Sequence, residues 1–245
     1  MSRPLALLIH SGGFTSRQWR RLGQQLAPTH DVLAPDLIGY GNNPWPPGKP
    51  FHFRQDVERL AGLLDRPADI VGHSYGGLLA LQLALVQPDR VRSLALYEPV
   101  AFGVLGEVDA DARAQLALPA YQGDAAGVDE AWLEGFVGWW NGAGAWAALP
   151  EATRAAFRAV AWKLHQEVAS LMADTTDRAR YATITAPTLL LGGDRTTSTE
   201  KLTLERLAEA LPHARLEMFP EMGHMGPITH ADVVNAAIVA HLTAP

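Results

Sequence analysis

The sequence predicts an α/β protein: a mostly parallel sheet of about six strands with helices on both faces and a helical cap insertion. Two observations favour this fold class. Short apolar runs, typical of buried parallel strands, alternate with helix-length stretches whose apolar residues recur three and four positions apart. Such alternation places helices on both faces of a parallel sheet and ligand sites at the carboxyl ends of the strands.

Six apolar runs are predicted as strands. Most of them end at Gly, Pro or Asp, which are typical turn residues. Helices are expected between them, because the intervening stretches carry an apolar stripe, as in Trp19, Leu22 and Leu26. The predicted strands are residues 5–9, 32–34, 68–71, 91–96, 188–191 and 214–219, and the predicted helices are 19–26, 57–64, 78–86 and 198–211.

Residues 100–183 break this alternation. They contain no convincing strand and are rich in Ala, Gly and Trp. We interpret them as a helical cap inserted over the strand ends of a core domain formed by residues 1–99 and 184–245. The tryptophans either pack the core of the insertion or line an apolar pocket. The expected pocket residues are Gly13, Trp139, Trp140 and Met225.

The composition excludes several classes of function. The 245 residues carry a formal net charge of −6, and no run of Lys or Arg could follow a phosphate backbone, so nucleic-acid binding is not expected. The absence of cysteine rules out disulfides, thiolate metal sites and a cysteine nucleophile. The apolar run 5–9 is shorter than a signal-peptide core or a membrane span, which predicts a cytoplasmic protein without membrane contact.

One motif is rejected. Residues 142–147 fit Gly-x-Gly-x-x-Ala, but no strand precedes them and they lie in the helical insertion, so they do not indicate a dinucleotide site. No phosphate-binding loop, zinc helix or calcium loop is found either. We therefore expect neither a cofactor nor a metal.

A candidate nucleophile lies directly after a predicted strand. Ser74 is the centre of a Gly-x-Ser-x-Gly motif, residues 72–76, between a predicted strand and a predicted helix. Gly72 and Gly76 are expected where a side chain would collide with a neighbouring strand or helix, so the turn can be tight and strained. Such a turn would raise Ser74 above the sheet and direct the N–H of Tyr75 at an oxyanion.

A serine at its ordinary pKa needs a base, and the base needs an acid to orient it. Of the nine histidines, His224 lies in a glycine-flanked loop after the last predicted strand, where it can swing over the sheet edge. Asp194 follows the strand 188–191 and gives the chain order Ser, Asp, His. Glu98, which follows the strand 91–96, is the alternative acid or a structural group near the insertion.

A second oxyanion donor is expected after the first strand. The strand 5–9 leads into a glycine-rich turn whose amides are not covered by side chains, and the N–H of Gly12 is the first choice there, with Gly13 as the second. Asp36 also ends a strand, and we interpret it as a structural residue that holds a turn.

In combination these segments resemble the α/β-hydrolase superfamily over nearly the whole chain. Residues 10–19 look like its oxyanion loop, residues 72–77 like its nucleophile elbow, Asp194 like its acid and residues 223–224 like its histidine loop. Residues 100–183 correspond to the variable cap of the family.

Two departures from the family pattern matter. Members usually carry His-Gly in the oxyanion loop, where this chain has His10-Ser11, so the amide that points inward is less well defined. Members also usually begin with an antiparallel hairpin, whereas the first strand here starts at Leu5. The resemblance therefore implies a sheet trimmed to about six strands, and the edge left exposed predicts a homodimer.

The residues and the resemblance together predict a serine hydrolase that cleaves a small to medium carboxylic ester through an acyl-enzyme. Ser74 would attack, His224 oriented by Asp194 would transfer the proton, and the amides of Gly12 and Tyr75 would hold the oxyanion. Carbon-carbon bond hydrolases, thioesterases, amidases and acyltransferases of the family use the same triad and remain alternatives. A member that binds a small molecule without turnover remains a further one.

Overall fold

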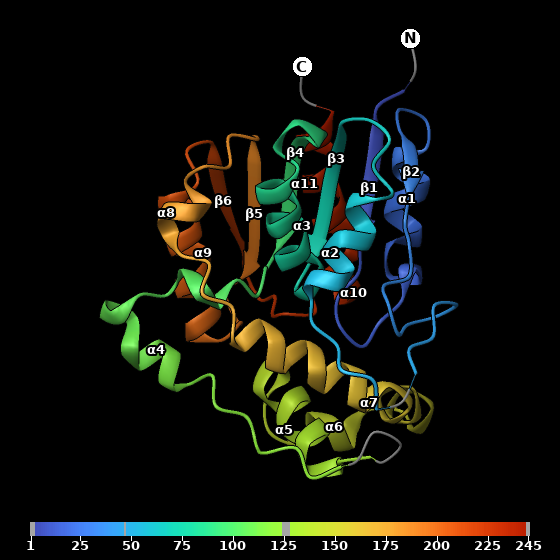
Figure 1. Cartoon of the computed structure of the whole chain (residues 1–245), viewed down its shortest axis with the longest axis vertical. Helices are drawn as coiled ribbons and strands as arrows, with labels where there is room; N and C mark the ends of the chain where they lie inside the picture. Colours follow the sequence, from blue (N-terminus) through green and yellow to red (C-terminus); the bar gives the residue numbers. More distant parts are fainter. Residues whose placement is uncertain (1–2, 47, 124–127, 244–245) are drawn as a thin grey trace.

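The computed structural model of the chain describes residues 3–46, 48–123 and 128–243, and it contains one six-stranded sheet (Figure 1). The strand order is β2-β1-β3-β4-β5-β6, and every neighbouring pair is parallel. Both ends of each predicted strand lie within two positions of the ends of an observed strand. The predicted fold class is confirmed. The strands are β1 (Leu5–Ile9), β2 (Asp31–Leu33), β3 (Ala68–His73), β4 (Val91–Tyr97), β5 (Thr188–Gly193) and β6 (Ala214–Phe219).

Helices cover both faces of the sheet because the central strands are apolar on both sides. Along β1, Leu5, Leu7 and Ile9 belong to one buried cluster, and Ala6 and Leu8 belong to the other, as the two-residue period of a strand requires. The first cluster packs against α2 (Arg54–Ala61), α3 (Tyr75–Val86) and α9 (Ser198–Ala210), and the second against α1 (Arg20–Leu26) and α11 (Ala231–Leu242).

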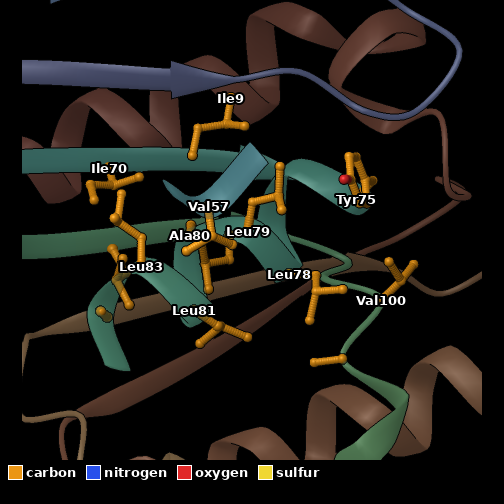
Figure 2. Packing of buried hydrophobic residues seen from close by; sticks show 14 of the residues in the cluster. Ile9, Val57, Ile70, Tyr75, Leu78, Leu79, Ala80, Leu81, Leu83 and Val100 are labelled. Carbon is orange, nitrogen blue, oxygen red and sulfur yellow. The ribbon is translucent and has the colours of Figure 1, made fainter. Parts of the chain in front are cut away.

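The helix α3 lies at the centre of the first face. Figure 2 shows its side chains Leu78, Leu79 and Leu81 among the buried residues, with Ile9 and Ile70 of the sheet nearby. Nine of its twelve residues are buried, so most of its surface is covered by protein. This packing fixes the turn that joins β3 to α3.

One predicted helix is displaced. The stripe of Val57, Leu60 and Leu64 predicted a helix over 57–64, but α2 covers Arg54–Ala61. It ends at Gly62, whose backbone entropy opposes helix continuation, and Leu64 is buried from the turn that follows.

The chain between β4 and β5 forms helices, and most of them lie beyond the carboxyl ends of the strands (Figure 1). Trp132, Trp146 and Phe157 pack in a small apolar cluster within this segment, so two of its tryptophans form its own core. Residues 142–147, rejected as a dinucleotide motif, lie at the end of α5 and in α6. The helices of the segment are α4 (Ala110–Ala114), α5 (Glu130–Asn141), α6 (Ala145–Ala148), α7 (Glu151–Met172) and α8 (Arg178–Tyr181).

The described residues contain neither a membrane-spanning helix nor a cluster of metal-ligating side chains. No helix there is long and apolar enough to cross a membrane. In the same part of the chain, no group of three or more His, Cys, Asp or Glu side chains is arranged to hold a metal ion.

Candidate active site

The candidate nucleophile lies in a strained turn between β3 and α3. Ser74 has φ 55° and ψ −118°, a conformation that residues other than glycine rarely adopt. A Cβ on Gly72 would lie 2.4 Å from the carbonyl oxygen of Gly76, and a Cβ on Gly76 would lie 2.3 Å from that of Ile9. The two glycines therefore occupy the positions that the sequence predicted, where only a missing side chain allows the close approach.

The imidazole of His224 lies between the serine and a carboxylate. Its Nε2 is 2.9 Å from Ser74 Oγ, and its Nδ1 is 2.8 Å from Glu98 Oε2. An ionised carboxylate only accepts hydrogen bonds, so the proton of a neutral His224 belongs on Nδ1 and the Nε2 lone pair accepts the serine hydroxyl. All three side chains are buried, with Ser74 8% and His224 4% exposed.

Glu98 is held from three directions. It follows β4 directly and has φ 43°, the left-handed region that a glutamate seldom adopts. Its Oε1 accepts the backbone N–H of Gly193 at 2.8 Å, and its Oε2 accepts the hydroxyl of Thr196 at 2.7 Å as well as the Nδ1–H of His224. A fully buried carboxylate with these donors is oriented before any substrate binds.

The prediction that Asp194 orients His224 is wrong. Asp194 is exposed, and its Oδ1 accepts the backbone N–H of Glu221 at 2.7 Å. The reason is that β5 continues through Gly193 and that the histidine loop passes directly over this glycine, where a Cβ would lie 2.0 Å from the carbonyl oxygen of Met222. Backbone therefore separates Asp194 from the imidazole, and Glu98, the alternative acid, takes the position beside it.

Two neighbours of the site fix the histidine loop. The Nε2–H of His73 donates to the carbonyl of His224 at 2.8 Å, while its Nδ1 accepts from the Gln18 amide at 3.0 Å. Burial, and then the nearby His224, lower the pKa of His73 well below its ordinary value, so His73 stays neutral. The hydroxyl of Tyr97 donates to the carbonyl of Gly223 at 2.8 Å.

The two residues predicted to supply the oxyanion donors both border the cavity at Ser74. Tyr75 is the first residue of α3, so its N–H has no acceptor within the helix. Gly12 lines the same cavity as Ser74 and Tyr75. Gly13 does not line it. The geometry favours Gly12, the first choice, over Gly13.

A cavity of about 560 Å³ opens onto Ser74 and His224, and most of its lining is apolar. Of the predicted pocket residues, Trp139, Trp140 and Met225 line it, whereas Gly13 does not. The ring of Trp140 stacks on the His224 imidazole, with centroids 3.4 Å apart and planes inclined by 13°. Among the described lining residues, the ionisable ones are Tyr75, Glu167 and His224.

Asp36 lies outside this constellation. It accepts the backbone N–H groups of Ser16 at 2.8 Å and Asn42 at 3.1 Å. The carboxylate ties two loops together, which agrees with the structural role that the sequence predicted.

A second buried carboxyl lies near Glu98. Glu200 of α9 is fully buried, and neither of its side-chain oxygens has a partner among the described residues. Burial, and then the charge of Glu98, raise the pKa of Glu200 well above its ordinary value of 4.5. In the unfolded chain the group ionises at its ordinary pKa, so folding becomes less favourable as the pH rises above about 4.5.

We expect Glu200→Gln to stabilise the protein at pH 8 by about 1 kcal/mol or more, because the variant has no buried acid to keep protonated. The difference should shrink toward zero near pH 4, where the carboxyl is protonated in both states. Urea unfolding of both proteins between pH 4 and pH 8 measures it. A difference that does not change with pH would contradict this account.

A serine on a strained strand-to-helix turn, at the carboxyl edge of a parallel sheet, with a histidine after the last strand, is the architecture of α/β hydrolases. The chain belongs to the alpha/beta hydrolase family, whose model matches residues 6–237. The predicted resemblance is thereby confirmed.

Among characterised relatives, the chain is 30% identical over 251 aligned positions to pimeloyl-[acyl-carrier protein] methyl ester esterase of Chromobacterium violaceum, an alignment that covers 98% of this chain and 94% of that protein. It is 39% identical to lipase LipV of Mycobacterium tuberculosis, but over only 47% of this chain and 44% of the lipase. A crystal structure of a hydrolase from Pseudomonas aeruginosa superimposes with a TM-score of 0.75 at 27% identity and covers 99% of this chain and 91% of that one.

Proposed function

We propose that the protein is a serine hydrolase that cleaves small to medium carboxylic esters through an acyl-enzyme. The observation that carries the proposal is the unbroken line of hydrogen bonds from Ser74 Oγ through His224 to Glu98. Nucleophile, base and orienting acid are in contact within one buried site, as covalent acyl transfer requires. The names of the relatives, an ester esterase and a lipase, agree with this chemistry.

The first half of the reaction forms the acyl-enzyme. Ser74 Oγ attacks the carbonyl carbon of the ester while His224 Nε2 takes the hydroxyl proton. The carbonyl oxygen becomes an oxyanion that accepts the N–H groups of Gly12 and Tyr75. Glu98 keeps the neutral imidazole in the reactive tautomer and stabilises the imidazolium that forms from it. The leaving alcohol then receives the proton from Nε2.

The second half releases the acid. Water takes the place of the alcohol and gives its proton to His224 Nε2 as it attacks the acyl carbon, and the proton returns to Ser74 Oγ when the tetrahedral intermediate collapses. Trp140, stacked on the imidazole, covers one face of the ring, and it restricts the approach of bulk water from that side.

The cavity supports an apolar substrate of limited size. About 560 Å³ is within the range of small-molecule sites, and the lining combines apolar side chains with few polar groups. In this proposal residues 100–183 form a cap that supplies the upper wall, including Trp139 and Trp140, and residues 1–99 and 184–245 form the core domain. We keep the predictions of a cytoplasmic location and a homodimer as part of the proposal.

The test combines a fluorophosphonate, which labels activated serines, with hydrolysis of p-nitrophenyl butyrate. We expect the wild type to be labelled and to hydrolyse the ester, and Ser74→Ala, whose fold should be unchanged, to do neither. Panels of thioesters, amides and carbon-carbon substrates would then rank the alternatives. A wild type that binds small acyl compounds without labelling or turnover would replace the proposal with a binding function.

A further inference from the structure

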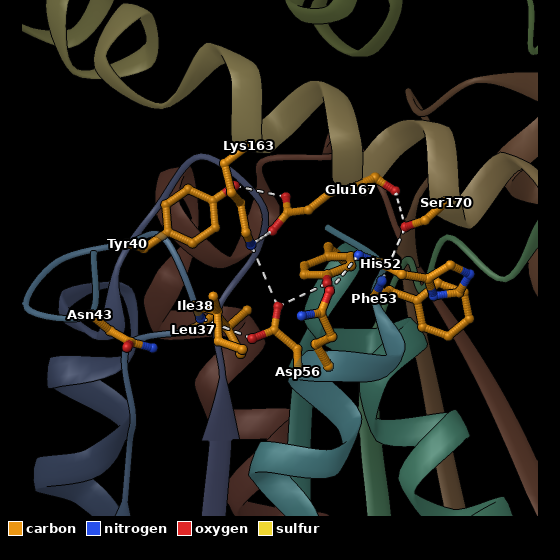
Figure 3. A network of polar contacts seen from close by, with 12 residues as sticks. Leu37, Ile38, Tyr40, Asn43, His52, Phe53, Asp56, Lys163, Glu167 and Ser170 are labelled. Atoms are coloured by element: carbon orange, nitrogen blue, oxygen red, sulfur yellow. Dashed lines mark hydrogen bonds and ion pairs between the residues drawn. The ribbon is translucent and has the colours of Figure 1, made fainter. Parts of the chain in front are cut away.

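A buried polar network joins α7 to the core beside the candidate active site (Figure 3). Lys163 and Glu167 lie one turn apart on α7 and are 4% and 1% exposed. The Lys163 ammonium contacts the Glu167 carboxylate and lies 3.5 Å from Oδ2 of Asp56, a buried residue of α2. Two carboxylates thus share one ammonium, and all three groups are almost fully buried.

The fold provides space for this ammonium. A Cβ on Gly39, which has φ +85°, would lie 2.7 Å from Lys163 Cγ, so the absence of a side chain there admits the lysine stem. The Nζ lies 4.3 Å from the ring centroids of both Tyr40 and Phe51. Burial is the main cause that raises the pKa of Glu167 to about 7, and Lys163 opposes it.

One arm of the network leads to the oxyanion loop. The hydroxyl of Tyr40 donates to Glu167 Oε2 at 2.7 Å. The same carboxylate oxygen lies against Gly12, since a Cβ on that glycine would be 2.9 Å from it. The Glu167 carboxylate, which accepts the Tyr40 hydroxyl, therefore packs directly against the oxyanion loop at Gly12.

The other arm leads to the elbow. The hydroxyl of Tyr75 donates to Asp56 Oδ2 at 2.9 Å, and the other oxygen of Asp56 accepts the N–H of Ile38 at 2.9 Å. Tyr75 supplies the second oxyanion amide from its own backbone. Both donors of the proposed oxyanion hole are thus connected, through their neighbours or side chains, to the ammonium of Lys163.

We propose that Tyr40, Asp56, Lys163 and Glu167 are positioning residues. Through them, helix α7 sets the distance between the Gly12 amide and the Tyr75 amide. The inference rests on the proposed function, because it gives the network a task only if an oxyanion forms at Ser74. A misplacement of about 1 Å can cost a factor of about 100 in rate. The network would then affect the transition state more than the bound substrate.

The test replaces Tyr40 by Phe, which removes only the hydroxyl that donates to Glu167. We expect kcat for p-nitrophenyl butyrate to fall roughly 10- to 100-fold with KM changed by less than about 3-fold. The inhibition constant of an alkyl trifluoromethyl ketone, whose serine adduct carries an oxyanion, should rise by the same factor as kcat/KM falls. A structural role alone would not produce this proportionality.

The matched control is Ser170→Ala. Ser170 lies on the same helix, one turn after Glu167, and its hydroxyl accepts the N–H of Phe53 at 3.2 Å, which is a second link between α7 and the start of α2. It does not line the cavity. We expect this variant to lose thermal stability while keeping kcat and the inhibition constant of the ketone.

Each outcome decides the proposal. Wild-type kcat in Tyr40→Phe with a lowered melting temperature would overturn the positioning role and leave the network as an attachment of α7. If Tyr40→Phe does not fold, the variants Glu167→Gln and Glu167→Ala are compared instead. Because Gln keeps an acceptor for the Tyr40 hydroxyl, the Gln variant should have a kcat at least 10-fold higher than the Ala variant. Equal kcat values would overturn the proposal. An unlabelled, inactive wild type would instead refute the proposed function.

Discussion

Exchange of Glu98 for Gln is expected to lower kcat for p-nitrophenyl butyrate by roughly 10⁴-fold. The amide oxygen would stay with the N–H of Gly193, which now donates to Oε1, so the NH₂ group would face His224 Nδ1. The imidazole would then carry its proton on Nε2 and could not accept that of Ser74. The measurement is steady-state hydrolysis together with the rate of fluorophosphonate labelling, which should fall in parallel.

Asp194→Asn is the matched control, since it makes the same chemical change at the acid that the chain order predicted. Its carboxylate is exposed and accepts only the Glu221 N–H among the described hydrogen bonds, so kcat should stay within about 2-fold of wild type. Thermal melts of both variants separate an effect on folding from one on catalysis. If Asp194→Asn loses activity while Glu98→Gln stays fully active, Asp194 and not Glu98 is the residue that orients His224.

The residue that orients His224 was predicted incorrectly from the sequence. Glu98 and Asp194 both follow apolar strands at the same edge of the sheet, and the Ser, Asp, His order favoured the wrong one. Two facts that only the structure provides decide between them. β4 lies directly beside β3, which carries Ser74, and β5 runs two residues past its predicted end, so the histidine loop crosses Gly193 and leaves Asp194 outside.

The fold and the contact between Ser74 and His224 could be predicted because each depends on local signals. Apolar runs of strand length with turn residues between them mark the strands, and glycines two residues either side of a serine mark a tight turn. His224 was separated from the other histidines by its glycine-flanked loop after the last strand. In each case the information lies within a few residues of the feature.

The buried network could not be predicted in this way, because the polar contacts that join α7 to the core link residues far apart in the chain. Asp56 and Lys163 are 107 positions apart, and Tyr40 and Glu167 are 127 positions apart. From sequence, a Lys and a Glu four positions apart on a helix indicate a solvated pair. Only a weak signal in the sequence indicates that Lys163 and Glu167 are buried. Leu164, Val168 and Leu171 lie near them in the sequence and on the side of α7 that faces the cavity.

Replacement of Gly76 by Ala is expected to cost about 3 kcal/mol of folding free energy or more, and to lower the melting temperature by roughly 6 to 12 °C. The new Cβ would lie 2.3 Å from the carbonyl oxygen of Ile9 and 2.6 Å from that of His10. Both are backbone atoms, and Ile9 is paired with Gly72 in the sheet, so neither can move aside alone. Calorimetry or urea unfolding measures the loss.

The same substitution at Gly138 provides the comparison. Gly138 lies inside α5, and a Cβ there would have nothing within 4 Å, so Gly138→Ala should raise stability by about 0.5 to 1 kcal/mol through helix propensity alone. The opposite signs expected for one chemical change separate close backbone approach from the general effect of a methyl group. A Gly76→Ala protein that melts within about 2 °C of wild type would show that β1 and the elbow can separate, and that the rigid turn assumed for Ser74 is not required by the packing.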